Sequence, residues 1–331
     1  FLKLFCYIGA LSCIGLYWFD REHLYMSLVC YLFGLVGFWG SLVFYNSYLP
    51  DIAYPEQQDA VSARGYSLGY IGSVVLLVGV LGVLLSAEDE NKMKVMRFSF
   101  VAVGIWWILF SQYSYYYLPK GAHRNKVTRD VMLNGFRELR KVWLQLKENL
   151  VLKRYLGAFF VYSMAVQTVM LAATYFGAEE INWPDDEAKS MGLIVSILLI
   201  QLIAVAGALL TSKLSAKIGN ITTLIYISAV WAVICICAWF VTEPMHFYVT
   251  AGFVGLVMGG IQSLSRSTYS KFLPDTKDTA SFFSFYDVTE KIGIVIGMLL
   301  YGAIDQAFHS QRYSVVFLTV FFVVGLLLLL T

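Results

Sequence analysis

Charged residues are scarce in this sequence. Only 14% of its 331 residues are Asp, Glu, Lys or Arg, and 59% are hydrophobic, whereas a soluble domain carries about 25% charged residues. A soluble chain of this length needs enough polar residues to coat one or two domains, so a soluble globular protein is excluded. The formal net charge is only +2, which gives no indication of the strongly basic face of a nucleic-acid-binding protein.

Residues that carry catalytic or metal chemistry are also few. The four histidines are scattered, and no two of them have a metal-ligand spacing. None of them joins a nucleophile in a recognisable constellation. All five cysteines lie inside apolar runs, where they usually act as small buried hydrophobic side chains. We therefore expect no enzyme activity, no metal site and no cofactor.

Proline is rare, and none of the six prolines interrupts a long apolar run. A transmembrane helix needs about 20 apolar residues, and the sequence has ten runs of about that length: 1–19, 25–48, 66–85, 98–118, 156–177, 191–211, 221–241, 246–265, 285–305 and 313–330. These runs lack the two-residue alternation of barrel strands, and the lipid core requires internally bonded helices. The pattern predicts an all-α polytopic membrane protein with ten transmembrane helices.

The distribution of Lys and Arg predicts the orientation. The connections after the second, fourth, sixth and eighth runs hold 16 of these residues, and the connections after the odd-numbered runs hold 6. The positive-inside rule places the first set in the cytoplasm, so both ends of the chain are expected there. Short loops and a compact linker favour a bacterial cytoplasmic (inner) membrane.

One connection, 119–155, is long and basic. Within it an apolar face recurs at helical steps of three and four residues: Met132, Phe136, Leu139, Trp143, Leu146 and Leu150. Basic residues around this face predict an amphipathic helix on the inner leaflet, attracted by anionic lipid. A helix that binds a protein partner has the same composition and remains an alternative.

A repeat relates two parts of the chain. Tyr45–Asp51 ends the second run and Tyr269–Asp275 ends the eighth, 224 residues later, and both contain Leu-Pro-Asp. Four runs after the basic linker precede the second copy, but only two runs precede the first. The repeat predicts that two helices precede residue 1, which gives two six-helix halves: helices 3–6 in 1–118, the linker 119–155, and helices 7–12 in 156–331. Parallel six-helix halves are the layout of major facilitator transporters.

Two sets of residues resemble that superfamily. The connection Ser212–Asn220 is similar to its cytoplasmic Gly-x-Leu-(small)-Asp-Arg-x-Gly motif at Leu214, Ser215, Lys217 and Gly219, with Ala216 in place of Asp. The segments 259–267, 273–274 and 282–288 resemble the bacterial relatives of the autophagy-related vacuolar amino-acid effluxers. The resemblance implies a major facilitator fold and a monomeric alternating-access transporter that exports or exchanges small solutes. It suggests amino acids or similar small solutes as the cargo. A receptor or scaffold on the same fold is the alternative.

Polar and aromatic residues on the runs that the resemblance places around a central cavity are substrate candidates: Phe38, Trp39, Asn46, Tyr162, Ser163, Gln167 and Gln262. Each polar one could equally hold neighbouring helices together. The candidates for a cytoplasmic gate are Asp51, Arg64, Lys213, Lys217, Arg266, Asp275, Asp287, Glu290 and Lys291. Arg266 could pair with one of the acids or extend to the membrane surface. No carboxylate suited to proton coupling is expected in the middle of a run.

Overall fold

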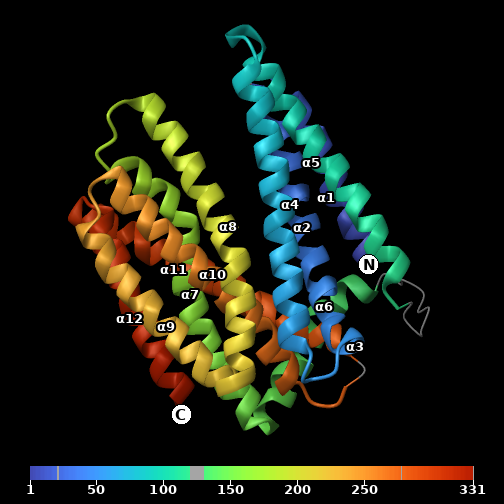
Figure 1. Cartoon of the computed structure of the whole chain (residues 1–331). Helices are drawn as coiled ribbons and strands as arrows, with labels where there is room; N and C mark the ends of the chain where they lie inside the picture. The colour runs from blue at the N-terminus through green and yellow to red at the C-terminus, as the bar shows by residue number, and fades with distance from the viewer. Residues whose placement is uncertain (21, 120–129, 277, 331) are drawn as a thin grey trace. The chain divides into compact units, whose positions relative to one another are not determined.

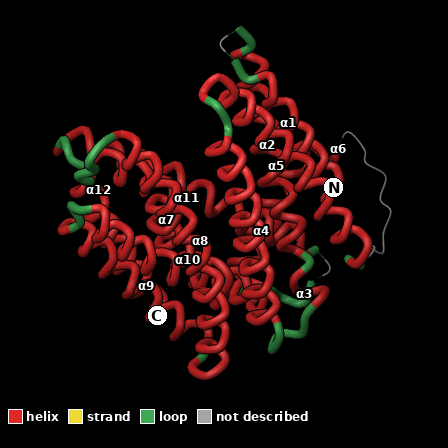
Figure 2. Tube along the Cα trace, turned by 45° about the horizontal axis from the view of Figure 1, so that its top comes forward, coloured by secondary structure: helices red, strands yellow, loops and turns green. Residues whose placement is uncertain are grey.

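The computed structural model describes residues 1–20, 22–119, 130–276 and 278–330. In these residues helices and loops make up the whole trace, and no strand occurs (Figure 2). Along the chain (Figure 1) the elements are α1 (Leu2–Gly15), η1 (Leu16–Trp18), α2 (Leu24–Ser47), α3 (Leu49–Ile52), α4 (Gln58–Ser86), α5 (Asp89–Tyr117), α6 (Asp130–Glu148), α7 (Leu150–Glu179), α8 (Asp186–Ile218), α9 (Asn220–Cys237), η2 (Ala238–Phe240), α10 (Pro244–Phe272), α11 (Thr279–Phe308) and α12 (Gln311–Leu330).

The helices follow the predicted apolar runs. Nine described helices are long and apolar enough to cross a membrane, and Leu2–Trp18 forms a shorter apolar helix. The prediction of an all-α polytopic membrane protein is confirmed, with nine full-length spans where the sequence predicted ten. Several helices begin earlier than their runs: α7 begins at Leu150, not at 156, and α11 begins at Thr279, not at 285.

The chain groups into two compact units. Unit 1 consists of Phe1–Ile52 and Val75–Gly135, and unit 2 consists of Ala53–Val74 and Phe136–Thr331. Helix α4 therefore contributes its first part to unit 2 and its last part to unit 1. The predicted six-helix halves remain a prediction.

Small residues bring the helices of unit 1 together. A Cβ atom at Gly37 of α2 would lie 2.4 Å from the Cα of Gly9 on α1, and one at Gly104 of α5 would lie 2.6 Å from the carbonyl oxygen of Ala10. Lipid tails are as apolar as the side chains, so membrane helices associate through such close packing and not through the hydrophobic effect. Helix α1 packs in this way against both α2 and α5.

The same principle holds in unit 2, where α8 and α10 have the closest pairing. A Cβ atom at Gly207 would lie 2.1 Å from the oxygen of Leu256, and one at Gly259 would lie 2.1 Å from the oxygen of Ala204. Helix α12 packs against α7 and α9, and the rings of Trp231 and Phe322 stack at 5.5 Å. Close packing of this kind holds the polar side chains of the unit in fixed positions.

Helix α6 covers part of its apolar face with protein. Val142 and Leu146 are 2% and 3% exposed, and the half-exposed ring of Trp143 stacks on Phe285 at 6.1 Å. Phe136, which the sequence placed on the face toward the inner leaflet, is 85% exposed. Residues 120–129 of the predicted linker, and the side chain of Met132, lie outside the described residues.

The prediction also placed Leu150 on the linker helix, which was wrong. Asn149 begins a new helix, because its Oδ1 accepts a hydrogen bond from the backbone N–H of Leu152 at 3.1 Å. Such an N-cap satisfies one of the free N–H groups at a helix start. Leu150 is therefore the first residue of α7.

Candidate functional site

The last turns of α10 hold a dense set of buried polar side chains. Six residues there are at most 5% exposed: Ser263, Ser265, Arg266, Ser267, Thr268 and Ser270. Hydroxyl groups can bond to the carbonyl one turn earlier, as Ser263 does to Gly259 at 2.8 Å and Thr268 to Leu264 at 2.6 Å. These bonds keep the hydroxyls inside an apolar bundle at little cost.

Arg266 joins α10 to α4. Its Nε donates to Oγ of Ser62 at 3.0 Å, and its Nη2 donates to the backbone oxygen of Ser62 at 3.1 Å. The guanidinium also lies 4.7 Å from the centre of the Tyr66 ring, a favourable cation–π arrangement. Arg266 is 4% exposed, so its side chain is enclosed by protein.

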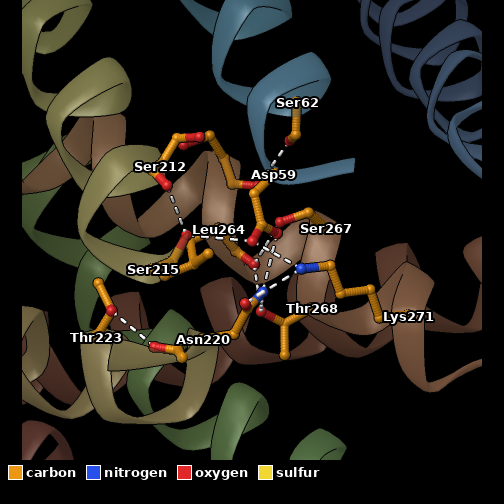
Figure 3. A network of polar contacts seen from close by, with 12 residues as sticks. Asp59, Ser62, Ser212, Ser215, Asn220, Thr223, Leu264, Ser267, Thr268 and Lys271 are labelled. Atoms are coloured by element: carbon orange, nitrogen blue, oxygen red, sulfur yellow. Dashed lines mark hydrogen bonds and ion pairs between the residues drawn. The ribbon is translucent and has the colours of Figure 1, made fainter. Parts of the chain in front are cut away.

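A second link between these helices surrounds Asp59 (Figure 3). Its carboxylate accepts from Nζ of Lys271 at 2.7 Å, from Nδ2 of Asn220 at 2.9 Å and from Oγ of Ser215 at 3.1 Å. Asn220 also bonds to Thr268 at 2.9 Å and accepts from Lys271 at 3.2 Å. We call Asp59, Ser215, Asn220, Thr268 and Lys271 the Asp59 network.

The positions of the two charges suit the helices that carry them. Asp59 lies in the first turn of α4 and Lys271 in the last turn of α10. An acid is favourable at a helix N-terminus and a cation at a C-terminus. The two side chains are 9% and 23% exposed, so the ion pair is partly shielded from solvent and is stronger than a surface pair.

The sharp turn between α8 and α9 delivers Asn220 to this network. Gly219 has φ 87°, a conformation that favours glycine because it has no Cβ atom. The turn ends α8 and lets Asn220 begin α9 beside Asp59. Asp59 of α4 thus places a carboxylate beside this connection, which has Ala216 at the acidic position of the motif.

Further polar contacts lie along α7. Tyr162 OH bonds to Oγ of Ser265 at 2.8 Å. Gln262 accepts from the OH of Tyr70 at 2.6 Å and donates to Sδ of Met170 at 3.4 Å. These contacts connect α7 and α10 with the first part of α4, all within unit 2.

The sequence profile of the family described as "Vacuole effluxer Atg22 like" matches residues 1–331, the whole chain. This chain belongs to the Atg22-like family. It is 28% identical over 339 residues to the MFS-type transporter YxiO of Bacillus subtilis, covering 99% of this chain and 76% of YxiO. It is 27% identical over 316 residues to autophagy-related protein 22 of Eremothecium gossypii, covering 85% of this chain and 60% of that protein.

Solved structures agree on the fold of this Atg22-like chain. The MFS proton:xylose symporter XylE aligns with a TM-score of 0.73 and 11% identity, over 98% of this chain and 78% of XylE. An identity this low shows the fold alone. The predicted major facilitator fold, and the resemblance to the Atg22 relatives, are confirmed.

The predicted cavity residues fall in both units. Phe38, Trp39 and Asn46 lie on α2 in unit 1, where the rings of Phe38 and Trp39 meet edge to face at 4.9 Å and Asn46 is 5% exposed. In unit 2, Tyr162, Gln167 and Gln262 bond to neighbouring helices, whereas Ser163 bonds to the carbonyl of Phe160 on its own helix. Their role in binding a substrate remains a prediction.

The predicted gate residues differ in how far their side chains are exposed. Asp51, Arg64, Lys213, Lys217 and Asp275 are exposed. The other four are Arg266, described above, and Asp287, Glu290 and Lys291, which form ion pairs on α11. The predicted pairing of Arg266 with an acid remains a prediction.

Sequence reasoning missed three residues: Asp59, Ser62 and Lys271. One signal was present, because Lys271 lies inside the repeated segment Tyr269–Asp275. Asp59 and Ser62 stand in a connection with no motif, and their partners lie more than 150 residues away. Only the fold brings them together.

Proposed function

We propose that the protein moves small solutes, amino acids among them, across a membrane by alternating access, as efflux or exchange. The observation that carries this proposal is the set of hydrogen-bonding side chains on α7 and α10, including Tyr162 and Gln262. Amide and hydroxyl groups can bind the ammonium and carboxylate groups of a zwitterion. The family description and the name of YxiO support transport.

Counterflow in proteoliposomes tests this proposal. The full-length protein is reconstituted with unlabelled protein amino acids inside, and radiolabelled ones are added outside. We expect transient accumulation of label that protein-free vesicles lack, and a reduction of about tenfold in Gln262→Leu, which removes the partner of Tyr70. Absence of counterflow with every amino acid would contradict the proposal and favour the receptor or scaffold alternative.

The Asp59 network and Arg266 are candidates for the gate of this transporter. Both tie the first part of α4 to α10 through contacts that can break as a unit. Alternating access requires such a two-state element. We place this gate on the cytoplasmic side, following the predicted orientation.

We further propose that the protein acts as a monomer in a cytoplasmic membrane and that α6 binds anionic lipid. Phe136 and Trp143 are exposed beside Arg137 and Arg140, a combination of aromatic and basic residues that suits the headgroup region. Vesicles of phosphatidylcholine with and without phosphatidylserine test the lipid claim. We expect phosphatidylserine to change transport by the parent protein more than transport by the variant Arg137→Gln/Arg140→Gln. Equal sensitivity of the two proteins to phosphatidylserine would contradict lipid binding by α6.

A further inference from the structure

Helix α11 carries three ionisable side chains on one stretch: Asp287, Glu290 and Lys291, here called the α11 triad. Nζ of Lys291 lies 2.7 Å from Oε2 of Glu290 and 3.5 Å from Oδ1 of Asp287. The side chains of Asp287, Glu290 and Lys291 are 13%, 15% and 26% exposed. The triad is therefore enclosed mainly by protein.

The triad stands at the start of the predicted run 285–305 but close to the middle of α11, which begins earlier. Glu290 stands eleven residues after Thr279 and eighteen before Phe308, which is roughly 17 Å and 27 Å along the helix axis at a rise of 1.5 Å per residue. A helix of this length matches the full bilayer with its headgroups, roughly 40–45 Å. Glu290 is thus within about one turn (5.4 Å) of the middle of α11.

A contact with α7 gives the same depth independently. Nε2 of Gln167 donates to Oε1 of Glu290 at 2.7 Å, and Gln167 stands seventeen residues after Leu150 and twelve before Glu179. The same two helices also approach each other about two turns further along α11, where a Cβ atom at Gly297 would lie 2.1 Å from Oγ1 of Thr168. Helices α7 and α11 therefore meet at more than one point.

The charge count of the triad is uneven. Two carboxylates and one ammonium give a net charge of −1 when all three are ionised. A net charge among membrane-spanning helices is costly. One bound proton makes the triad neutral and removes that cost.

Glu290 is the member best suited to take the proton. The amide of Gln167 can donate to its carboxylate, as it does here, or accept from its carboxyl O–H after rotation. Lys291 keeps Asp287 as a counter-ion in either case. The contact between α7 and α11 thus survives protonation of Glu290.

The described groups around the triad are mainly tyrosines. Tyr162 of α7 and Tyr286 of α11 interact electrostatically with Glu290, and Tyr155 of α7, Tyr269 of α10 and Tyr66 of α4 lie in the next layer. Phenols are neutral at physiological pH. Arg266 is bonded to Ser62 and Tyr66, and Arg312 of α12 is paired with Glu180 at the far end of the bundle.

We propose that Glu290 binds the proton that couples solute transport to a pH gradient, with Gln167 and Lys291 positioning its carboxylate. The inference rests on the proposed transport function. The proton adds to Oε1 or Oε2 of Glu290 from one side of the membrane and leaves to the other, and no other bond forms or breaks. Solute and proton then share one conformational cycle.

Two assays on the same proteoliposomes test this inference. Counterflow of radiolabelled protein amino acids at equal pH measures exchange, and net uptake with an imposed pH gradient and an internal pH dye measures coupling. For the parent protein we expect the gradient to drive net uptake and the dye to report proton movement. In Glu290→Gln we expect exchange to persist while gradient-driven uptake falls at least tenfold. Asp305→Asn, a carboxylate at the outer end of the same helix, should keep both.

The outcomes separate the two proposals. No counterflow by the parent protein would overturn the transport function and this inference with it. Counterflow without a response to the pH gradient, or a gradient response retained by Glu290→Gln, would overturn the proton role alone. Should Glu290→Gln fail to insert, Glu290→Asp decides: its pH profile of exchange must shift relative to the parent protein, and an unshifted profile would overturn the inference.

Discussion

Asp59 and Lys271 lie at opposite helix ends, and their charges depend on each other. Replacing one of them leaves its partner partly buried without a counter-charge, which costs more than removing both. We expect Asp59→Asn and Lys271→Met each to lower the exchange rate about tenfold, the equivalent of about 1.4 kcal/mol. The double variant should be less impaired than the product of the two effects. Initial exchange rates, normalised to inserted protein, measure this.

Lys213→Met is the matched control for this pair. Lys213 is an exposed cation of the α8–α9 region, so its loss should change the exchange rate less than twofold. If Lys213→Met lowered the exchange rate as much as Lys271→Met does, the loss would come from the net charge of the protein and not from the Asp59–Lys271 ion pair. Strictly multiplicative effects in the double variant would likewise contradict direct coupling between Asp59 and Lys271.

The sequence revealed some of these residues and concealed others. Arg266, Gln262 and Gln167 stand out because polar groups are costly within apolar runs, and the structure gives each of them a partner on another helix. Asp59 sits in an ordinary polar connection and resembles any solvated loop residue. Its significance comes from a tertiary contact across 212 positions of sequence, which no local pattern records.

The pairing of α8 with α10 depends on glycine at the closest contacts. A leucine at Gly259 would push its Cβ atom against the oxygen of Ala204, and the helix backbones would have to separate. Overpacking of this kind costs about 1–3 kcal/mol. We expect Gly259→Leu to lower Tm by about 2–4 °C, measured by thermal unfolding in detergent.

Gly302→Leu is the control for that experiment. A Cβ atom at Gly302 meets nothing within 4 Å, so the same substitution on another span should leave Tm within about 1 °C. An equal loss in both variants would indicate a general intolerance of leucine. No loss at Gly259 would contradict the close approach of α8 and α10.

Glu180 joins the end of α7 to the start of α12 outside the membrane spans. Burial raises the pKa of its carboxyl, but hydrogen bonds from Ser310, from the Arg312 side chain and from the backbone N–H of Gln311 outweigh burial and leave the pKa below its usual value. Nε of Arg312 lies 2.8 Å from Oε2. A lowered pKa adds stability that is complete above the unfolded pKa of about 4.3 and is lost as pH falls through the folded pKa.

We therefore expect an acid-dependent loss of Tm that Glu180→Gln lacks. Thermal unfolding between about pH 3 and pH 6 spans the window in which the carboxyl gains its proton. Glu187 is an exposed acid of α8, and Glu187→Gln should retain the acid-dependent loss of Tm. If the Tm of the parent protein and that of Glu180→Gln fell in parallel with pH, the contribution of Glu180 to acid-dependent stability would be contradicted.

Hydropathy locates the helices better than it locates their ends. An apolar run marks only the part of a helix in lipid, and α11 continues for six residues before the predicted start at 285. Glu290 therefore lies near the start of the apolar run but close to the middle of the helix. Likewise, the periodicity of α6 identified an amphipathic helix but not which of its residues would be covered by unit 2.

Across the whole molecule, the distribution of Lys and Arg predicts which end of each helix faces the cytoplasm. Helix α8 offers the cleanest test, because its 33 residues span about 48 Å and both ends must leave the roughly 30 Å hydrocarbon core. In a variant without native cysteines, Glu187→Cys marks one end and Lys217→Cys the other. Both positions are exposed, so reagent access depends on the membrane alone.

In intact cells we expect a membrane-impermeant maleimide to label Glu187→Cys fully and Lys217→Cys only after permeabilisation. The expectation follows from the 16 basic residues assigned to the cytoplasmic connections against 6 on the other side. Labelling in the reverse order would invert the topology. The Asp59 network would then close the outer face, and the proton on Glu290 would enter the cycle from the opposite compartment. The orientation therefore decides which compartment the Asp59 network and the predicted loops face.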